Sequence, residues 1–78
     1  MTMTDWTKYI ERRPGVMLGK PVFKGTRITV EFILERLAQG STYENLVENI
    51  EGLEINHILA ALAYATSMMR NDLLVTTA

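Results

Sequence analysis

The sequence contains no cysteine in its 78 residues. A disulfide framework and a zinc site built on thiolates are therefore both excluded. A chain of this length is expected to form a single domain, residues 1–78, and to bury only ~60% of its unfolded surface. Because cross-links are unavailable, association with another chain is the remaining way to stabilise so small a core.

Long apolar runs and a basic leader are also missing. No stretch approaches the ~20 apolar residues that a membrane span requires. The first residues, MTMTDWTKYI, lack the basic start and apolar run of a secretory signal. We therefore expect a cytoplasmic protein without membrane association.

Residues suited to enzymatic chemistry are scarce. His57 is the single histidine, and no motif pairs it with a metal-binding carboxylate. The helix acids are most simply a solvated face and helix-start charges: Glu44, Glu48, Glu51 and Glu54. We predict no catalytic residue, no metal site and no cofactor, and an enzyme is the least supported class of function.

Positive charge is unevenly distributed along the chain. Residues 1–27 carry six lysines and arginines against two acids, a net charge of +4. Residues 28–78 carry two against seven, a net charge of −5, so the total of −1 hides the division. A basic segment of this kind favours a polyanionic partner, and chance asymmetry on a solvated surface explains it equally well.

Residues 19–30, GKPVFKGTRITV, combine turn signals with short β-prone segments. Gly25 lies where a tight reversal needs positive φ, which glycine adopts at low cost. Pro21 lacks an N–H and belongs at a strand start or edge. We predict a β-hairpin arm over about residues 9–28, in which residues 16–18 pair with Val22 and Phe23, and Tyr9 and Ile10 add a short strand.

Three segments with helical apolar spacing follow the arm. The first covers residues 30–39, with Thr29 as N-cap and Gly40 just past its end. The second opens with a capping box formed by Ser41 and Glu44, and ends at residues 51–52. The third begins near Ile55 and extends to about residue 74. The short glycine-containing link between the last two predicts a helix-turn-helix.

The third helix carries two apolar faces. Its main stripe is predicted to be buried, as is Leu34 of the first helix, and consists of Ile55, Ile58, Leu59, Leu62, Ala65, Met69 and Leu73. Small residues, one aromatic residue and one methionine on its other face suit contact between subunits. We predict a homodimer through Ala61, Tyr64 and Met68, the alternative being a core that wraps this helix on both sides.

DNA contacts would come from two places. The last helix of most helix-turn-helix proteins reads bases with its N-terminal residues, which here are Asn56 and His57. A partly exposed helix histidine without this role is the simpler interpretation of His57. The arm cations Lys20, Lys24 and Arg27 are predicted to contact phosphates, although an ion pair between Arg27 and Glu31 is equally compatible with the sequence.

The pattern G-K-P-V-x-K-G-T-R-I-x-V, followed by a helix, Gly-Ser, a second helix and AALAYA, resembles domain-of-unknown-function family 433 over roughly residues 9–69. Members are small bacterial proteins similar to the DNA-binding part of antitoxins. The resemblance implies a mainly α, homeodomain-like three-helix core over about residues 29–74. It also implies an antitoxin-like protein that binds a ribonuclease-like toxin and operator DNA. The alternative is a non-enzymatic interaction or adaptor module that does not bind DNA.

Overall fold

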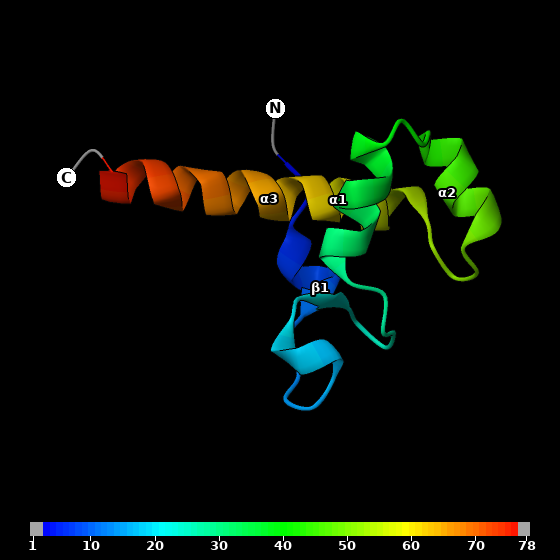
Figure 1. Cartoon of the computed structure of the whole chain (residues 1–78), viewed down its shortest axis with the longest axis horizontal. Coiled ribbons are helices and arrows are strands. Elements are labelled where there is room, and N and C mark those ends of the chain that lie inside the picture. Colours follow the sequence, from blue (N-terminus) through cyan, green and yellow to red (C-terminus); the bar gives the residue numbers. More distant parts are fainter. Residues whose placement is uncertain (1–2, 77–78) are drawn as a thin grey trace.

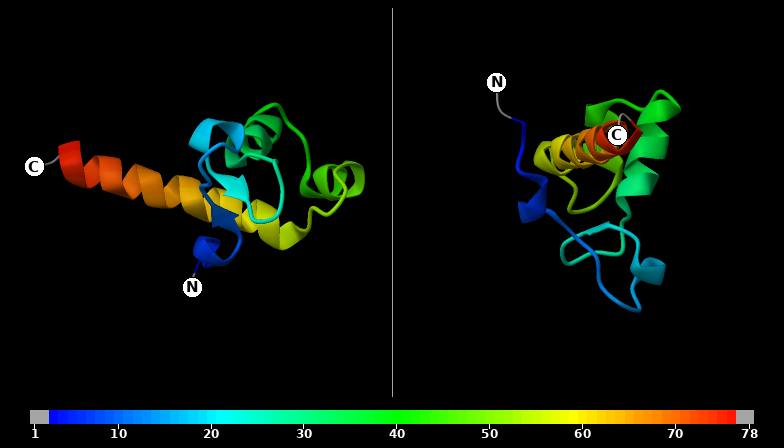
Figure 2. Two further views of the ribbon diagram at one scale, coloured as in Figure 1. Left: turned by 90° about the horizontal axis from the view of Figure 1, so that it is seen from below. Right: turned by 90° about the vertical axis from the view of Figure 1, so that its left-hand side faces the viewer.

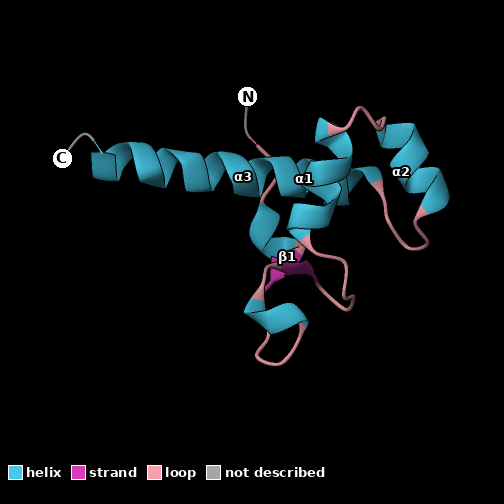
Figure 3. Ribbon diagram, in the orientation of Figure 1, coloured by secondary structure: helices cyan, strands magenta, loops and turns pink. Residues whose placement is uncertain are grey.

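The computed structural model describes residues 3–76 of the chain, with side chains for residues 3–70. Its elements are, in order, η1 (Trp6–Lys8), β1 (Ile10–Glu11), η2 (Met17–Gly19), β2 (Val22–Phe23), α1 (Val30–Ala38), α2 (Tyr43–Asn49) and α3 (Ile55–Thr76). α1 crosses the long helix α3, α2 lies at one end of it, and the arm lies below (Figures 1 and 3). The mainly α fold with an N-terminal hairpin arm is confirmed.

Helix α1 begins and ends as its local sequence predicts. The Thr29 hydroxyl accepts a hydrogen bond from the Phe32 N–H at 3.0 Å, which satisfies a donor of the first turn. At the other end Gly40 has a φ of 98°. The Gly40 N–H donates to the Leu37 carbonyl and the Ser41 N–H to the Arg36 carbonyl, each at 3.0 Å. This pair of bonds is the Schellman arrangement that closes a helix at glycine.

The predicted start of α2 at a capping box is wrong by one residue. Thr42, and not Ser41, accepts the capping hydrogen bond, from the Asn45 N–H at 3.0 Å. The Ser41 N–H is already bonded to Arg36, so Ser41 belongs to the end of α1. α2 ends at Asn49, and residues 50–54 connect it to α3 through Gly52 at a φ of 83°.

The predicted pairing of residues 16–18 with β2 is wrong. β2 pairs instead with β1, antiparallel, with Ile10 opposite Phe23. Met17 and Leu18 have φ values of 49° and 59°, in the left-handed region that no strand uses. They form the turn η2, whereas Ile10 and Phe23 are both buried. The reversal at Gly25 is confirmed, with a φ of 76° and a 3.0 Å hydrogen bond from the Thr26 N–H to the Phe23 carbonyl.

The core lies where the arm, α1 and the first half of α3 meet, and its largest fully buried side chains are Phe23, Ile33, Ile58, Val22 and Val30. The predicted buried stripe of α3 is only partly correct. Ile58 is buried, but Ile55 and Met69 are 42% and 63% exposed, and Leu62 is half-buried, as is Leu34 of α1. The side chain of Leu73 lies outside the described residues.

The face of α3 that is fully buried contains alanines. Ala60 and Ala61 are both 0% exposed. Their small side chains allow neighbouring segments to approach the helix closely, and the N-terminal segment lies across it (Figure 2). Trp6 of η1 makes an edge-to-face contact with Tyr64, with ring centroids 4.8 Å apart. The N-terminal segment therefore contacts α3 at Tyr64, one of the residues that the sequence assigned to a second subunit.

Candidate nucleic-acid interface

Lys20 and Arg12 of the arm each bind another side chain of the same chain. Lys20 Nζ lies 2.9 Å from Glu31 Oε1 in the first turn of α1. The hydrogen bond and the charge of Glu31 raise the pKa of Lys20. An ion pair between Arg27 and Glu31 was one of the two alternatives for Arg27, and in the structure Lys20 is the residue that pairs with Glu31. Arg12 donates to the Tyr64 hydroxyl at 2.9 Å, which links the arm to α3.

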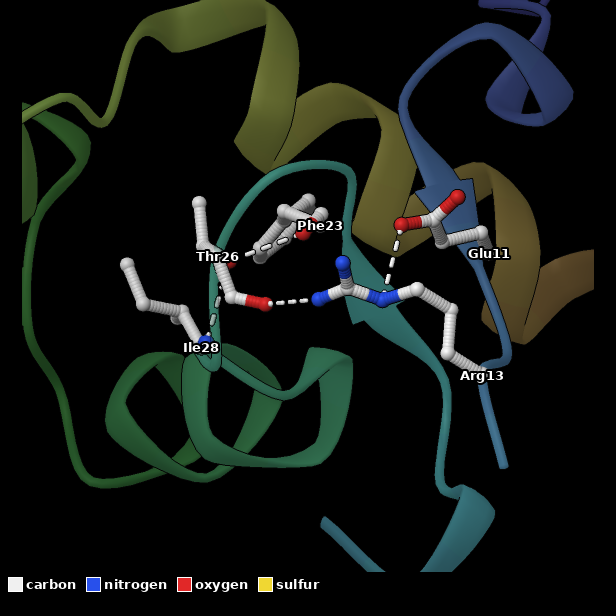
Figure 4. Close-up of polar contacts among 5 residues, drawn as sticks. All are labelled: Glu11, Arg13, Phe23, Thr26 and Ile28. Carbon is white, nitrogen blue, oxygen red and sulfur yellow. Dashed lines mark hydrogen bonds and ion pairs between the residues drawn. The ribbon is translucent and has the colours of Figure 1, made fainter. Parts of the chain in front are cut away.

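Arg13 supports the turn that carries Lys24 and Arg27 (Figure 4). Its guanidinium donates to the Thr26 carbonyl at 2.9 Å and lies 3.1 Å from a Glu11 carboxylate oxygen. The Thr26 hydroxyl donates to the Phe23 carbonyl at 2.8 Å and accepts from the Ile28 N–H at 3.0 Å. Sequence reasoning missed this role of Arg13, because its contact with the turn spans thirteen residues and leaves no local pattern.

The other two cations of the arm are exposed, as is Lys8 at the end of η1. Lys8, Lys24 and Arg27 make no ion pair or side-chain hydrogen bond with any other residue in the described range 3–70. Hydrogen bonds from Thr7 hold the pKa of Asp5 below its usual value, and the charges of Lys8 and Lys24 lower it further. The Lys24 N–H donates to the Tyr9 carbonyl at 2.8 Å, so Lys24 lies next to the end of η1, which carries Lys8. Lys8 was not among the predicted contacts.

Arg27 lies in a cleft of about 360 Å³ that it shares with Lys20. Glu31 and Glu35 line the same cleft, so its charge is balanced. The structure thus brings Lys20 and Arg27 together and places Lys24 beside Lys8.

The two predicted base readers, Asn56 and His57, differ in exposure and in their contacts. Asn56 is exposed in the first turn of α3. His57 is half-buried, with its ring edge-to-face against Tyr9 and Phe23 at centroid distances of 5.5 and 5.3 Å. Its Nδ1 accepts a 3.0 Å hydrogen bond from the Glu54 N–H, which caps α3. These contacts use His57 to join the arm to the start of α3, and its contact with bases stays a prediction.

Known proteins that resemble this chain include a sequence family and a solved structure. The family described as protein of unknown function (DUF433) matches residues 10–65. The chain belongs to the DUF433 family. It is similar to the crystal structure of a DUF433 member from Anabaena variabilis ATCC 29413, with 26% identity and a TM-score of 0.65. The similarity covers 86% of this chain and 67% of that chain. No curated protein sequence matches the present chain significantly.

The DUF433 match ends at residue 65, within α3, whose C-terminal part projects beyond the other elements (Figure 1). Of the three predicted dimer residues, Ala61 is fully buried within the chain, and Tyr64 contacts Trp6 and Arg12. The prediction that Ala61 contacts a second subunit is thus wrong. Met68 lines a groove of about 510 Å³ between α1 and α3.

Among the described residues, no group of three or more histidine, aspartate or glutamate side chains is placed to hold a metal ion. No described helix is long and apolar enough to cross a bilayer.

Proposed function

We propose that this protein is the antitoxin-like member of a toxin–antitoxin pair. It binds operator DNA with its arm, and its second partner is a ribonuclease-like toxin. The observation that carries the proposal is the exposure of Lys8, Lys24 and Arg27 without partners among the described residues. Every other described cation of the arm is held by an intramolecular contact. Cations left free at the surface are those that phosphates can use.

The helices favour an orientation in which the arm faces DNA. Residues 28–78 carry seven acids, and those on α2 and at the start of α3 are exposed: Glu44, Glu48, Glu51 and Glu54. A duplex approaching that side would meet like charge. Of the two predicted readers on α3, Asn56 is exposed and His57 is half-buried, so phosphate contacts supply most of the affinity and little sequence preference.

The test is a binding titration on DNA from upstream of the gene, repeated at several salt concentrations. Each phosphate contact contributes about −0.9 to the slope of log affinity against log salt. Lys24→Ala and Arg27→Ala should each make the slope shallower by about one for every bound chain. Arg36→Ala is the matched control, because it removes the same charge from the exposed surface of α1.

Two outcomes would contradict arm-based DNA binding. In one, Asn56→Ala abolishes binding while both arm variants keep the parent's affinity and slope. In the other, Arg36→Ala weakens binding as much as the arm variants, which would make net charge the cause. Co-purification with an untagged neighbouring gene product tests the toxin partner separately.

The alternative function is a protein-interaction module that does not bind DNA. The apolar groove between α1 and α3 favours it, since a groove of this kind suits a protein partner better than a phosphate backbone. Absence of DNA binding at low salt would establish the alternative.

A further inference from the structure

The turn η2 holds an apolar side chain in solvent. Leu18 is 96% exposed, and its neighbour Met17 is 45% exposed. Met17, Leu18 and Gly19 have φ values of 49°, 59° and 77°, so two non-glycine residues in succession adopt the left-handed conformation. This conformation is unfavourable for residues other than glycine, and it persists in proteins where the surrounding structure or a function requires it. No contact within the described chain accounts for presenting a leucine in this way.

The groove between α1 and α3 is the complementary feature. Its apolar walls are formed by Val30, Leu34 and Ala38 of α1 and by Ala65, Met68 and Met69 of α3. Its volume of about 510 Å³ exceeds that of a leucine side chain several times. Part of one wall belongs to the section of α3 that projects beyond the other elements (Figure 1). Leu18 does not fill the groove of its own chain, because it is almost fully exposed.

The charges around the two features are opposite. Residues 12–20, which contain the Leu18 turn, include Arg12, Arg13 and Lys20 and no acid. The groove is edged by Glu31 and Glu35. Glu31 pairs with Lys20 of its own chain, whereas Glu35 makes no ion pair with any described residue. The three cations keep their own partners, Tyr64, Glu11 and Glu31, so the turn contributes positive potential, and Glu35 contributes the negative charge that it would face.

We propose that two copies of this chain associate about a twofold axis, each inserting its Leu18 turn into the α1–α3 groove of the other. A twofold arrangement makes the contact reciprocal and closed, so both turns and both grooves are used. η2 and the projecting part of α3 are separate protrusions, which allows a second copy to reach between them (Figure 2). The proposal does not depend on DNA binding. In this arrangement the subunit interface lies away from the buried Ala61 face, and Met68 remains part of the interface.

The first experiment measures molar mass by light scattering at low and high micromolar concentration, for the parent and two variants. Leu18→Asn removes the apolar side chain but keeps a residue that tolerates the left-handed conformation. Met69→Glu places a carboxylate in the groove at a position that is 63% exposed, so the fold is retained. Each contact that buries a leucine changes a dissociation constant by roughly tenfold or more, and two contacts by ~100-fold or more.

We expect the parent to reach twice the chain mass and both variants to remain monomeric at concentrations where it dimerises. Ile55→Asn is the matched control, since Ile55 is a 42% exposed apolar residue outside the groove. It should dimerise as the parent does. Circular dichroism spectra and melting curves confirm that each variant is folded.

A second experiment tests whether the contact is between chains. The sequence has no cysteine, so a disulfide can form only where one is introduced. Leu18→Cys mixed with Met69→Cys should give a mixed cross-linked dimer under mild oxidation, and Ile55→Cys mixed with Met69→Cys should give much less. In the first experiment, the proposal is overturned if the parent stays monomeric, if its molar mass exceeds that of two chains, or if both Leu18→Asn and Met69→Glu dimerise as the parent does. In the second, it is overturned if the two mixtures cross-link equally.

Discussion

At the scale of single residues, Trp6 is held by one capped turn and one aromatic contact. Asp5 caps η1 by accepting a 3.1 Å hydrogen bond from the Thr7 N–H. This places Trp6 against Tyr64, whose hydroxyl in turn accepts a hydrogen bond from Arg12. Since Trp6 is the single tryptophan of the chain, its fluorescence reports directly on the contact between the N-terminal segment and α3.

The capping role of Asp5 predicts a dependence on pH. Its pKa is lowered from 3.8, chiefly by the hydrogen bonds from Thr7. The charged form therefore stabilises the fold above the unfolded pKa, and this contribution is lost as pH falls through the lower folded pKa. Asp5→Asn can still accept the bond without titrating. Its unfolding midpoint in urea, followed by Trp6 fluorescence, should fall less than the parent's on acidification. Equal losses in both proteins would contradict this role.

At the scale of elements, α1 depends on the hydroxyl at its N-cap. Thr29 is 8% exposed and lies opposite Val22 in a β-bridge, so the cap also joins the arm to the helix. The next turn contributes Val30 and Ile33 to the core. A weakened cap therefore loosens the part of α1 that the arm packs against.

Thr29→Ala should lower the free energy of unfolding by about 0.5–2 kcal/mol, the usual range for losing such a cap. Urea denaturation measures this loss. Thr29→Ser retains the hydroxyl and should keep most of the stability. If the serine variant loses as much as the alanine variant, then the buried methyl group, and not the capping bond, is what matters at this position.

At the scale of the whole molecule, stability rests on a core of few side chains. Ile33 is 0% exposed in this core, whereas Leu34, the next residue of α1, is half-buried against its edge. A domain of this length is stabilised by only ~5–10 kcal/mol. The free energy lost when one central side chain is removed is therefore a large fraction of the total stability.

Ile33→Ala should cost ~2–5 kcal/mol and Leu34→Ala clearly less, because the cost of truncation increases with the cavity it leaves. Thermal melts followed by circular dichroism should show the Ile33 variant largely destabilised and the Leu34 variant still folded at room temperature. Similar melting temperatures for the two would mean that the face of α1 assigned to the core is wrong.

Local interactions determined the features that the sequence alone predicted correctly. The Gly25 reversal, the Thr29 cap and the Gly40 helix end each depend on residues within one turn of each other. Residue types at such short separations largely fix the backbone. The division of charge between arm and helices is likewise a property of the sequence.

Tertiary contacts decided the rest. Ile10 pairs with Phe23 across a loop, and His57 joins Tyr9 to the start of α3, so neither contact has a local pattern. Residues 58–65 of α3 are all apolar or small, so such side chains lie on every side of this part of the helix. Helical periodicity alone therefore could not predict which face is buried. Tertiary contacts make that choice, because they bury Ala61, place the N-terminal segment against Tyr64 and leave the α1–α3 groove open.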